Sequence, residues 1–379
     1  MADQANEDLL PGRATAAGTR RFAQRFEHLP GHFRRPDSLS LSSLALGSRR
    51  GRPGGIDDLL YRSAVAQCLE GGINVFDTAL SDRDMTSERA IGHAVRRGFV
   101  EELAQRDEVV IVTKGGQLTL DPDALLRSHY PQHGLYATYV ESGIIEPDQV
   151  VNGNCLAPRF LRDQIERSRR NLGLATLDIY LVQEPELHLR ELGPSRFRRA
   201  LCDVFEALEC AVRDGVIGAY GLSTWSGFLV PHQEREHLSL VDVFEAALDV
   251  GGADHHLRAI QLPYGLAMGE GAGVASQLGP DGHSQAILES LYDTGTVVLA
   301  SAPLYGGRLV GRIPKEIREA FPETRSDAQT CLQFVRSTKG ITTAVVGMRE
   351  PDHVDENIAT ATFPPADPSI PADLFRRFA

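Results

Sequence analysis

Two oppositely charged residues end neighbouring apolar runs in this chain of 379 residues, and together they could do acid–base chemistry. Asp77 ends the run 73–77 (INVFD), and Lys114 ends the run 109–114 (VVIVTK). Burying a lone ammonium is costly unless a carboxylate accepts its hydrogen bonds, so we expect Asp77 and Lys114 to pair. A helix N-cap for Asp77 and a solvated strand end for Lys114 are the alternatives.

The scarcity of lysine makes Lys114 more informative. Only Lys114, Lys315 and Lys339 are lysines among the 39 basic residues, and the other 36 are arginines. A compact ammonium has a pKa that its surroundings can shift, whereas a guanidinium is always charged. A lysine in a chain that otherwise uses arginine therefore favours a chemical use for this ammonium.

The elements that must position these residues are short apolar runs, each followed by a stretch of helical character. There are eight runs, at 43–47, 73–77, 109–114, 177–183, 217–223, 257–262, 296–301 and 342–347. Segments 157–172 and 197–214 have apolar residues at helical spacing. Eight buried strands alternating with helices predict an α/β fold, a (β/α)8 TIM barrel, because doubly wound sheets have fewer strands. The glycines of 269–273 fall in a loop, so a Rossmann fingerprint is not indicated.

The predicted domain organisation is simple. Residues 1–36 are expected to form a polar, partly flexible leader, and residues 37–379 a single barrel domain. Two long loops, 115–156 after the third strand and 263–282 after the sixth, follow strand ends. Because the active sites of such barrels lie at the strand C-terminal ends, both loops are expected to shape a pocket.

Composition excludes several classes of protein. The net charge is −12 and no Lys/Arg-rich stripe occurs, which argues against nucleic acid as a partner. No apolar run is long enough to span a membrane, and we expect a cytoplasmic protein with a small-molecule substrate. The five cysteines have no zinc or disulfide spacing, and Pro131 interrupts the pair His129 and His133, so no metal site is predicted. The sequence gives no oligomeric state.

Several motifs, in order along the chain, resemble those of the aldo/keto reductases, NADP(H)-dependent carbonyl reductases built on a (β/α)8 barrel. The motifs are 71–79 (GGINVFDTA), 87–92 (SERAIG), 112–115 (VTKG), 168–173 (SRRNLG), 178–181 (DIYL), 221–223 (GLS), 303–304 (PL) and 346–357. The resemblance covers residues 39–358.

The family's chemistry uses an aspartate, a tyrosine acid, a lysine and a histidine. Asp77 matches the aspartate and Lys114 the lysine, whereas Asp82 stands at the place of the tyrosine and Gln183 at that of the histidine. An unperturbed aspartic acid has a pKa of about 3.9, against about 10 for a phenol, so Asp82 is expected to be an anion suited to act as a base. Gln183 does not titrate, but its amide can orient a carbonyl or hydroxyl group.

The resemblance also implies NADP(H) as cofactor and a set of residues to hold it. Ser223, Thr224 and Gln261 match positions at the nicotinamide, and Pro303, Leu304 and Arg308 would meet the pyrophosphate. The adenosine end, with its 2′-phosphate, falls at Gly347, Arg349, Glu356 and Asn357. An arginine binds a phosphate bidentately, which favours NADP over NAD.

Three functions compete at this stage. The first is an NADPH-dependent carbonyl reductase with a substitute acid, for which the loop residues Tyr130, Tyr136 and Tyr139 are the candidates. The second is a non-redox dehydratase, cyclase or lyase with Asp82 as base and Lys114 stabilising an enolate or alkoxide. The third is a non-catalytic barrel that binds a nucleotide. Trp225, at the barrel rim, is expected either to stack on a ligand or to pack in its loop.

Overall fold

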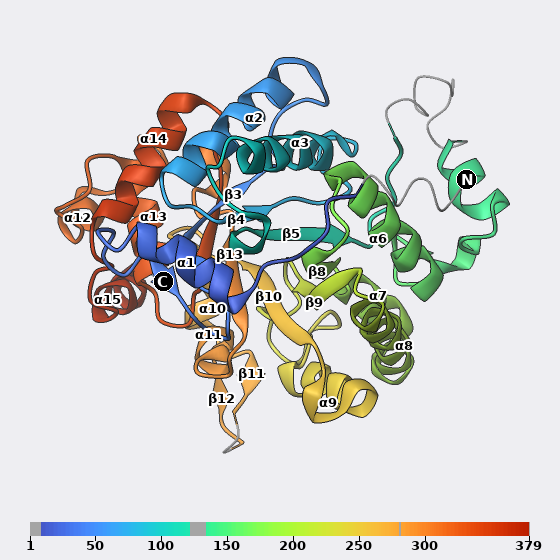
Figure 1. The fold of residues 1–379 in the computed structure, drawn as a ribbon. Coiled ribbons are helices and arrows are strands. Elements are labelled where there is room, and N and C mark those ends of the chain that lie inside the picture. Colours follow the sequence, from blue (N-terminus) through green and yellow to red (C-terminus); the bar gives the residue numbers. More distant parts are fainter. Residues whose placement is uncertain (1–8, 122–133, 280–281, 379) are drawn as a thin grey trace.

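The computed structural model describes residues 9–121, 134–279 and 282–378, and eight parallel strands form a closed barrel within them (Figure 1). Neighbouring strands pair in chain order around the barrel, and the last strand pairs with the first. The strands are β3 (Leu44–Gly47), β4 (Val75–Asp77), β5 (Val110–Gly115), β8 (Leu177–Gln183), β9 (Ile217–Ser223), β10 (Leu257–Pro263), β13 (Val297–Ser301) and β14 (Thr343–Gly347). Each lies within two residues of its predicted run, so the predicted barrel is confirmed.

Helices surround the barrel on its outside (Figure 1). The longer ones are α2 (Gly55–Glu70), α3 (Thr86–Val100), α6 (Pro158–Leu172), α8 (Pro194–Arg213), α9 (Leu240–Gly251), α13 (Asp327–Ser337), α14 (Pro351–Ala359) and α15 (Ser369–Phe378). α8 begins three residues before its predicted start because Pro194 is its first residue and Gly193, with φ 72°, turns the chain into it. In the described residues of the segment after β5, the elements are short: the π-helix η2 (Tyr136–Glu141), the 3₁₀ helix η3 (Pro147–Gln149) and the strands β6 (Val150–Val151) and β7 (Asn154–Cys155).

Strand alternation points the candidate residues into the barrel. Val75 in β4 and Val110 and Val112 in β5 belong to one small apolar cluster, whereas Phe76 and Ile111 belong to the large cluster that the helices cover. Side chains alternate between the two faces of a strand, so Asp77 and Lys114 follow Val75 and Val112 to the inner face. The same phase places Gln183, Gln261 and Ser301 there, after Leu181, Ala259 and Leu299.

The described part of the leader packs at the opposite end of the barrel. α1 (Ala16–Arg25) begins after Thr15, whose hydroxyl caps it. Arg21 Nε lies 2.8 Å from Glu108 Oε1, in η1 (Arg106–Glu108), and Thr19 Oγ1 accepts a hydrogen bond from Ser40 N. Both contacts precede barrel strands, so α1 lies away from the strand C-terminal ends. The division of the chain at residue 36 remains a prediction.

The glycine-rich loop after β10 has a packing role. Gly269 precedes α10 (Glu270–Gly273) and Gly273 ends it, and a Cβ atom at either would overlap the ring of Phe375 on α15. These glycines therefore let the C-terminal helix approach the loop closely. Among the described residues, no helix is long and apolar enough to cross a membrane.

Candidate active site

A cavity of about 650 Å³ opens where the barrel strands end. Most of the predicted site residues line it, although they come from seven of the eight strands or the loops and helix that follow them. These residues are Asp77, Asp82, Lys114, Gln183, Ser223, Thr224, Trp225, Gln261, Pro303, Leu304, Gly347, Arg349, Glu356 and Asn357.

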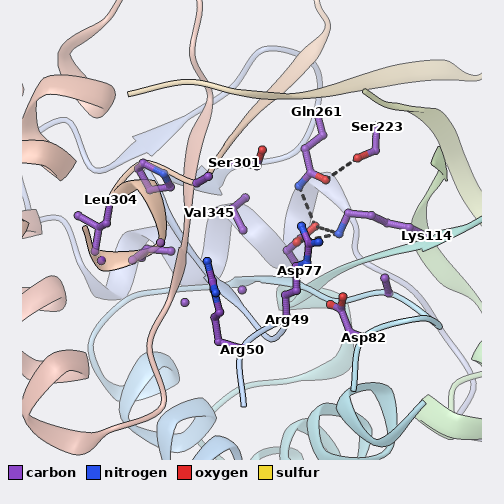
Figure 2. A pocket seen from close by; sticks show the side chains of 18 of the residues that line it. Arg49, Arg50, Asp77, Asp82, Lys114, Ser223, Gln261, Ser301, Leu304 and Val345 are labelled. Atoms are coloured by element: carbon purple, nitrogen blue, oxygen red, sulfur yellow. Dashed lines mark hydrogen bonds and ion pairs between the residues drawn. The ribbon is translucent and has the colours of Figure 1, made fainter. Parts of the chain in front are cut away.

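Asp77 and Lys114 form a buried ion pair at the floor of this cavity (Figure 2). Lys114 Nζ lies 2.7 Å from both carboxylate oxygens of Asp77 and 2.8 Å from the carbonyl oxygen of Thr78. The two side chains are 8% and 9% exposed. An ammonium has three N–H donors, and these three acceptors occupy all of them. Lys114 can therefore act on a ligand through its charge, but not through a free hydrogen bond.

The amide of Gln261 and the hydroxyl of Ser223 extend the Asp77–Lys114 pair along the barrel floor (Figure 2). Gln261 Nε2 donates to Asp77 Oδ1 at 3.0 Å, and Ser223 Oγ donates to Gln261 Oε1 at 2.9 Å. The chain of bonds fixes the orientation of the Gln261 amide. It also leaves Asp77 with donors on both oxygens, which is what a buried carboxylate requires.

Asp82 lies beside this pair in the turn after β4, and its side chain points into the cavity (Figure 2). The next three residues, Arg83, Asp84 and Met85, all have positive φ, at 48°, 51° and 65°. Such backbone is strained for residues other than glycine and persists only where other contacts hold it. The turn therefore has to be held in place by its surroundings.

Arg83 supplies those contacts. Its side chain is 1% exposed, donates from Nη1 to Asp58 Oδ1 at 2.9 Å and lies 4.7 Å from the centre of the Tyr61 ring. Arg83 Nε also donates to Ser87 Oγ at 2.8 Å. The carboxylate of Asp82 is thus presented by a strained turn with a buried anchor.

The environment of Asp82 changes its expected protonation. Burial raises its pKa to about 6, while the charges of Lys114 and Arg49 oppose the shift and that of Asp77 adds to it. No side-chain hydrogen bond to Asp82 occurs among the residues that the structure describes. With a pKa of about 6, roughly one molecule in ten is protonated at pH 7, against about one in a thousand for an unperturbed aspartic acid. Asp82 can therefore exchange a proton near neutral pH.

Gln183 ends β8 at the cavity wall. Its Oε1 accepts a hydrogen bond from Ser81 Oγ at 3.5 Å, and its backbone carbonyl accepts one from Asn154 Nδ2 at 2.8 Å. His188 Nε2 lies 3.2 Å from Asn154 Oδ1 and does not line the cavity. Burial lowers the pKa of His188. This histidine supports the backbone behind Gln183 and does not replace the family's histidine at the site.

Two neutral polar atoms of the cavity lining are orphaned, one in the loop after β9 and one on α14. Thr224 Oγ1 and Asn357 Oδ1 are buried and have no hydrogen-bond partner among the described residues. Buried polar groups are nearly always satisfied, so each is an argument for a ligand group that bonds there. Arg349 lies at the same end as Asn357, with its Nε 2.6 Å from Asp57 Oδ1 and its Nη atoms unbonded to described residues.

Three predicted site residues lie elsewhere. Tyr139 is fully buried between η2 and α6, where its hydroxyl donates to the Thr119 carbonyl at 2.6 Å and burial raises its pKa to about 12. Tyr136 is 53% exposed on η2, outside the cavity lining. Arg308 stacks on the ring of Tyr305 and does not line the cavity either. Tyr130, with His129 and His133, lies outside the described residues.

These placements correct the prediction for Tyr136, Tyr139 and Arg308, none of which lines the cavity, whereas the prediction for Tyr130 stays untested. The π-helix around Tyr139 packs that ring onto Phe160, at 5.2 Å between ring centres, so its hydroxyl faces the interior. No tyrosine lines the cavity among the described residues, which leaves Asp82 as the titratable group beside the ion pair.

The cavity also has lining residues that the sequence interpretation missed. The polar ones among them are Arg49, Arg50, Gln117 and His353, and Glu184 lines the cavity as well. Gln117 Nε2 donates to Glu184 Oε2 at 2.6 Å, which satisfies that carboxylate in part. Arg49 and Arg50 stand two and three residues after the end of β3, and their position after a barrel strand was the signal that could have identified them.

The closed barrel and a charged cavity at its strand ends define an α/β-barrel protein with an enzyme-like site. Residues 44–230 match the model of the aldo/keto reductase family, so this part of the chain is an aldo/keto reductase domain. A D-threo-aldose 1-dehydrogenase from a Pseudomonas species is 23% identical over 319 residues, which cover 82% of this chain and 84% of that protein.

Solved structures resemble the fold over nearly the whole chain. An aldo/keto reductase from Klebsiella pneumoniae in complex with NADP and acetate is 20% identical, with a TM-score of 0.60, covering 92% of this chain and 95% of the other. A Klebsiella pneumoniae aldo-keto reductase with NADPH has a TM-score of 0.58 at 20% identity, covering 91% and 94%. An aldo-keto reductase from Bacillus halodurans, in its holo form, has a TM-score of 0.58 at 19% identity, covering 90% and 95%.

Proposed function

We propose that this protein is an NADP(H)-dependent oxidoreductase that oxidises a hydroxyl group of a small molecule, with Asp82 as the general base. The observation that carries the proposal is the raised pKa of Asp82, about 6, in a cavity beside the Asp77–Lys114 pair. A base works best when its pKa lies near the operating pH and it is mainly ionised there. The name of the Pseudomonas relative, D-threo-aldose 1-dehydrogenase, agrees with this direction.

The cavity residues fit NADP(H). The orphaned Thr224 Oγ1 and Asn357 Oδ1 supply polar atoms at either end, and the free Nη atoms of Arg349 suit a 2′-phosphate. Ser223 and Gln261 would hold the nicotinamide end, and Glu356 the adenosine end. When bound, the cofactor would accept or supply the hydride. Two of the structural relatives were solved with NADP or NADPH, which supports the same assignment.

The chain's own part in the reaction is to move one proton. As the substrate carbon gives up its hydrogen with two electrons, the O–H bond breaks and Asp82 takes the proton, so that a C=O bond forms. The charge of Lys114 opposes protonation of Asp82 and so keeps its pKa near 6 rather than higher. Asp77 holds Lys114 in place, and the Gln183 amide is available to orient the substrate oxygen.

The direct test is cofactor reduction by purified protein. NADP⁺ is supplied with a panel of polyols, aldoses and hydroxy acids, and NADPH formation is followed by absorbance. At least one compound is expected to give steady NADPH formation, with NAD⁺ a poorer cofactor. Absence of hydride transfer with every compound, in both directions, would reject the proposal.

Replacement of Arg349 tests the cofactor assignment separately. Arg349→Ala should weaken NADPH binding roughly 10- to 100-fold, because a charge-assisted contact to the 2′-phosphate is lost. NADH binding should change little, because NADH lacks that phosphate. Fluorescence titration measures both, and Arg308→Ala, whose side chain lies outside the cavity, is the matched control. Equal losses for the two nucleotides would contradict the assignment.

A second candidate is a non-redox enzyme, a dehydratase, cyclase or lyase, which the substitution of a carboxylate for the family's tyrosine favours. Asp82 would again be the base. Lys114 would stabilise the enolate or alkoxide through its charge alone, because its three N–H donors already bond to Asp77 and Thr78. Product formation without net change in the cofactor would support this candidate over the first.

A further inference from the structure

Two adjacent arginines in the cavity carry charges that the catalytic pair does not use. Arg49 and Arg50 follow β3, line the cavity and are exposed to it. Neither side chain has an ion pair or hydrogen bond with any residue of 9–121, 134–279 or 282–378. The substrate end of the cavity therefore contains a cation that no carboxylate neutralises directly.

The backbone that carries these arginines is held in place on both sides. Ser48 N donates to the Asp77 carbonyl at 3.0 Å, and the Ser48 carbonyl accepts from Ser87 Oγ at 2.9 Å. The Arg50 carbonyl accepts from Tyr61 OH at 2.8 Å, and Arg52 N donates to Asp57 Oδ2 at 2.7 Å. The loop backbone is anchored while the two guanidinium groups remain unpaired, as a pre-organised binding site requires.

The two arginines face different parts of the cavity (Figure 2). Arg49 lies near Asp82, and its charge lowers the pKa of Asp82. Arg50 lies against the loops after β13 and β14, where its side chain approaches Gly306 and Gly347. Arg49 thus adjoins the reacting centre, whereas Arg50 adjoins the loops assigned to the cofactor.

We propose that the substrate carries a carboxylate and that Arg49 binds it, so that the hydroxyl compound oxidised is a hydroxy acid. A guanidinium matches a carboxylate with two parallel hydrogen bonds. A monoanion also suits this place better than a phosphate dianion, because the carboxyl groups of Asp82 and Glu184 line the same cavity and negative charge there repels a dianion more strongly than a monoanion. The proposal rests on the function proposed above.

The test compares acids with their uncharged analogues. Lactate, 3-hydroxybutyrate and their primary amides are supplied with NADP⁺ to the wild type and to Arg49→Ala, Arg49→Lys and Arg52→Ala. The wild type should prefer acid over amide on the order of 30-fold in kcat/KM, chiefly through KM, and Arg49→Ala should abolish the preference. Arg49→Lys should keep part of it. Arg52→Ala should keep all of it, because that side chain does not line the cavity.

A binding measurement separates this proposal from the proposed function. Calorimetric titration of NADP⁺-saturated protein with 3-hydroxybutyrate and with its amide needs no turnover. Arg49-dependent binding of the acid alone supports the carboxylate site even if no hydride is transferred. Three results would overturn the carboxylate site. They are equal binding of acid and amide, a preference for the acid that survives Arg49→Ala, and Arg49-dependent binding of glycerol phosphate in place of the acid. Turnover of uncharged polyols alone would overturn it while the oxidoreductase function stands.

Discussion

Lys114→Met is expected to abolish hydride transfer and to lower the free energy of unfolding by about 3–5 kcal/mol, the usual cost of leaving a buried charge unpaired. Asp77 would lose both of its 2.7 Å contacts with Nζ and keep only the donor from Gln261. Methionine preserves the length and most of the volume of the lysine stem, so the loss would come from the charge. Urea denaturation measures the stability, and NADPH formation the activity.

A second variant separates stability from chemistry. Asp77→Asn with Lys114→Met removes both charges, so most of the stability should return, whereas activity should not. Lys315→Met is the surface control, because that lysine is 81% exposed and should change neither property. If Lys114→Met unfolds at the same urea concentration as the wild type, the Asp77–Lys114 ion pair does not contribute to stability as its burial indicates.

The fold and the ion pair could be predicted because both depend on local pattern. Each barrel strand is buried on both faces, so the strands appear in the sequence as short apolar runs. Side chains alternate between the inner and outer faces along a strand, and this alternation includes the polar residue at its end. Asp77 and Lys114 keep the phase of Val75 and Val112, and that phase alone places them on the inner face. The resemblance of motifs then added the roles of the two residues.

The residues that were misplaced or missed lie in loops, where no period constrains a side chain. Tyr139 belongs to a π-helix whose packing on Phe160 turns the hydroxyl inward, and the sequence around it carries no signal for that geometry. Arg49 and Arg50 stand in a glycine-rich loop whose course depends on distant anchors such as Tyr61. The pKa of Asp82 likewise depends on burial by residues far away in the chain.

Asp82→Asn is expected to lower the rate of hydride transfer by about 100- to 10,000-fold, the typical contribution of a positioned base. Asparagine has the same shape but cannot take a proton. Affinity for NADPH should be unchanged. In the wild type, the rate of oxidation should fall as the pH drops through about 6, because Asp82 becomes protonated, whereas the reverse reduction should rise. Stopped-flow measurements in both directions test this pair of opposite profiles.

The same substitution should stabilise the fold, which distinguishes a functional carboxylate from a structural one. The folded state raises the pKa of Asp82 from 3.8 to about 6, so the folded protein binds this proton more tightly than the unfolded chain does. The carboxyl group therefore does not destabilise the fold below about pH 4. As the pH rises through 6, the free energy of unfolding that is lost to the buried carboxylate grows to about 3 kcal/mol at pH 7. Asp82→Asn should raise the free energy of unfolding by about that amount at pH 7 and by little at pH 4.

Glu184→Gln is the matched control for Asp82→Asn. Glu184 is also a carboxylate of the cavity wall, but Gln117 donates to it, and it has no place in the proton transfer. Its replacement should leave the opposite pH profiles in place.

A loss of stability at pH 7 in Asp82→Asn would mean that the carboxylate helps to hold its strained turn. Wild-type turnover in that variant would mean that another group takes the proton. A gain in stability together with lost turnover is the result expected of a group kept for chemistry at a cost to the fold.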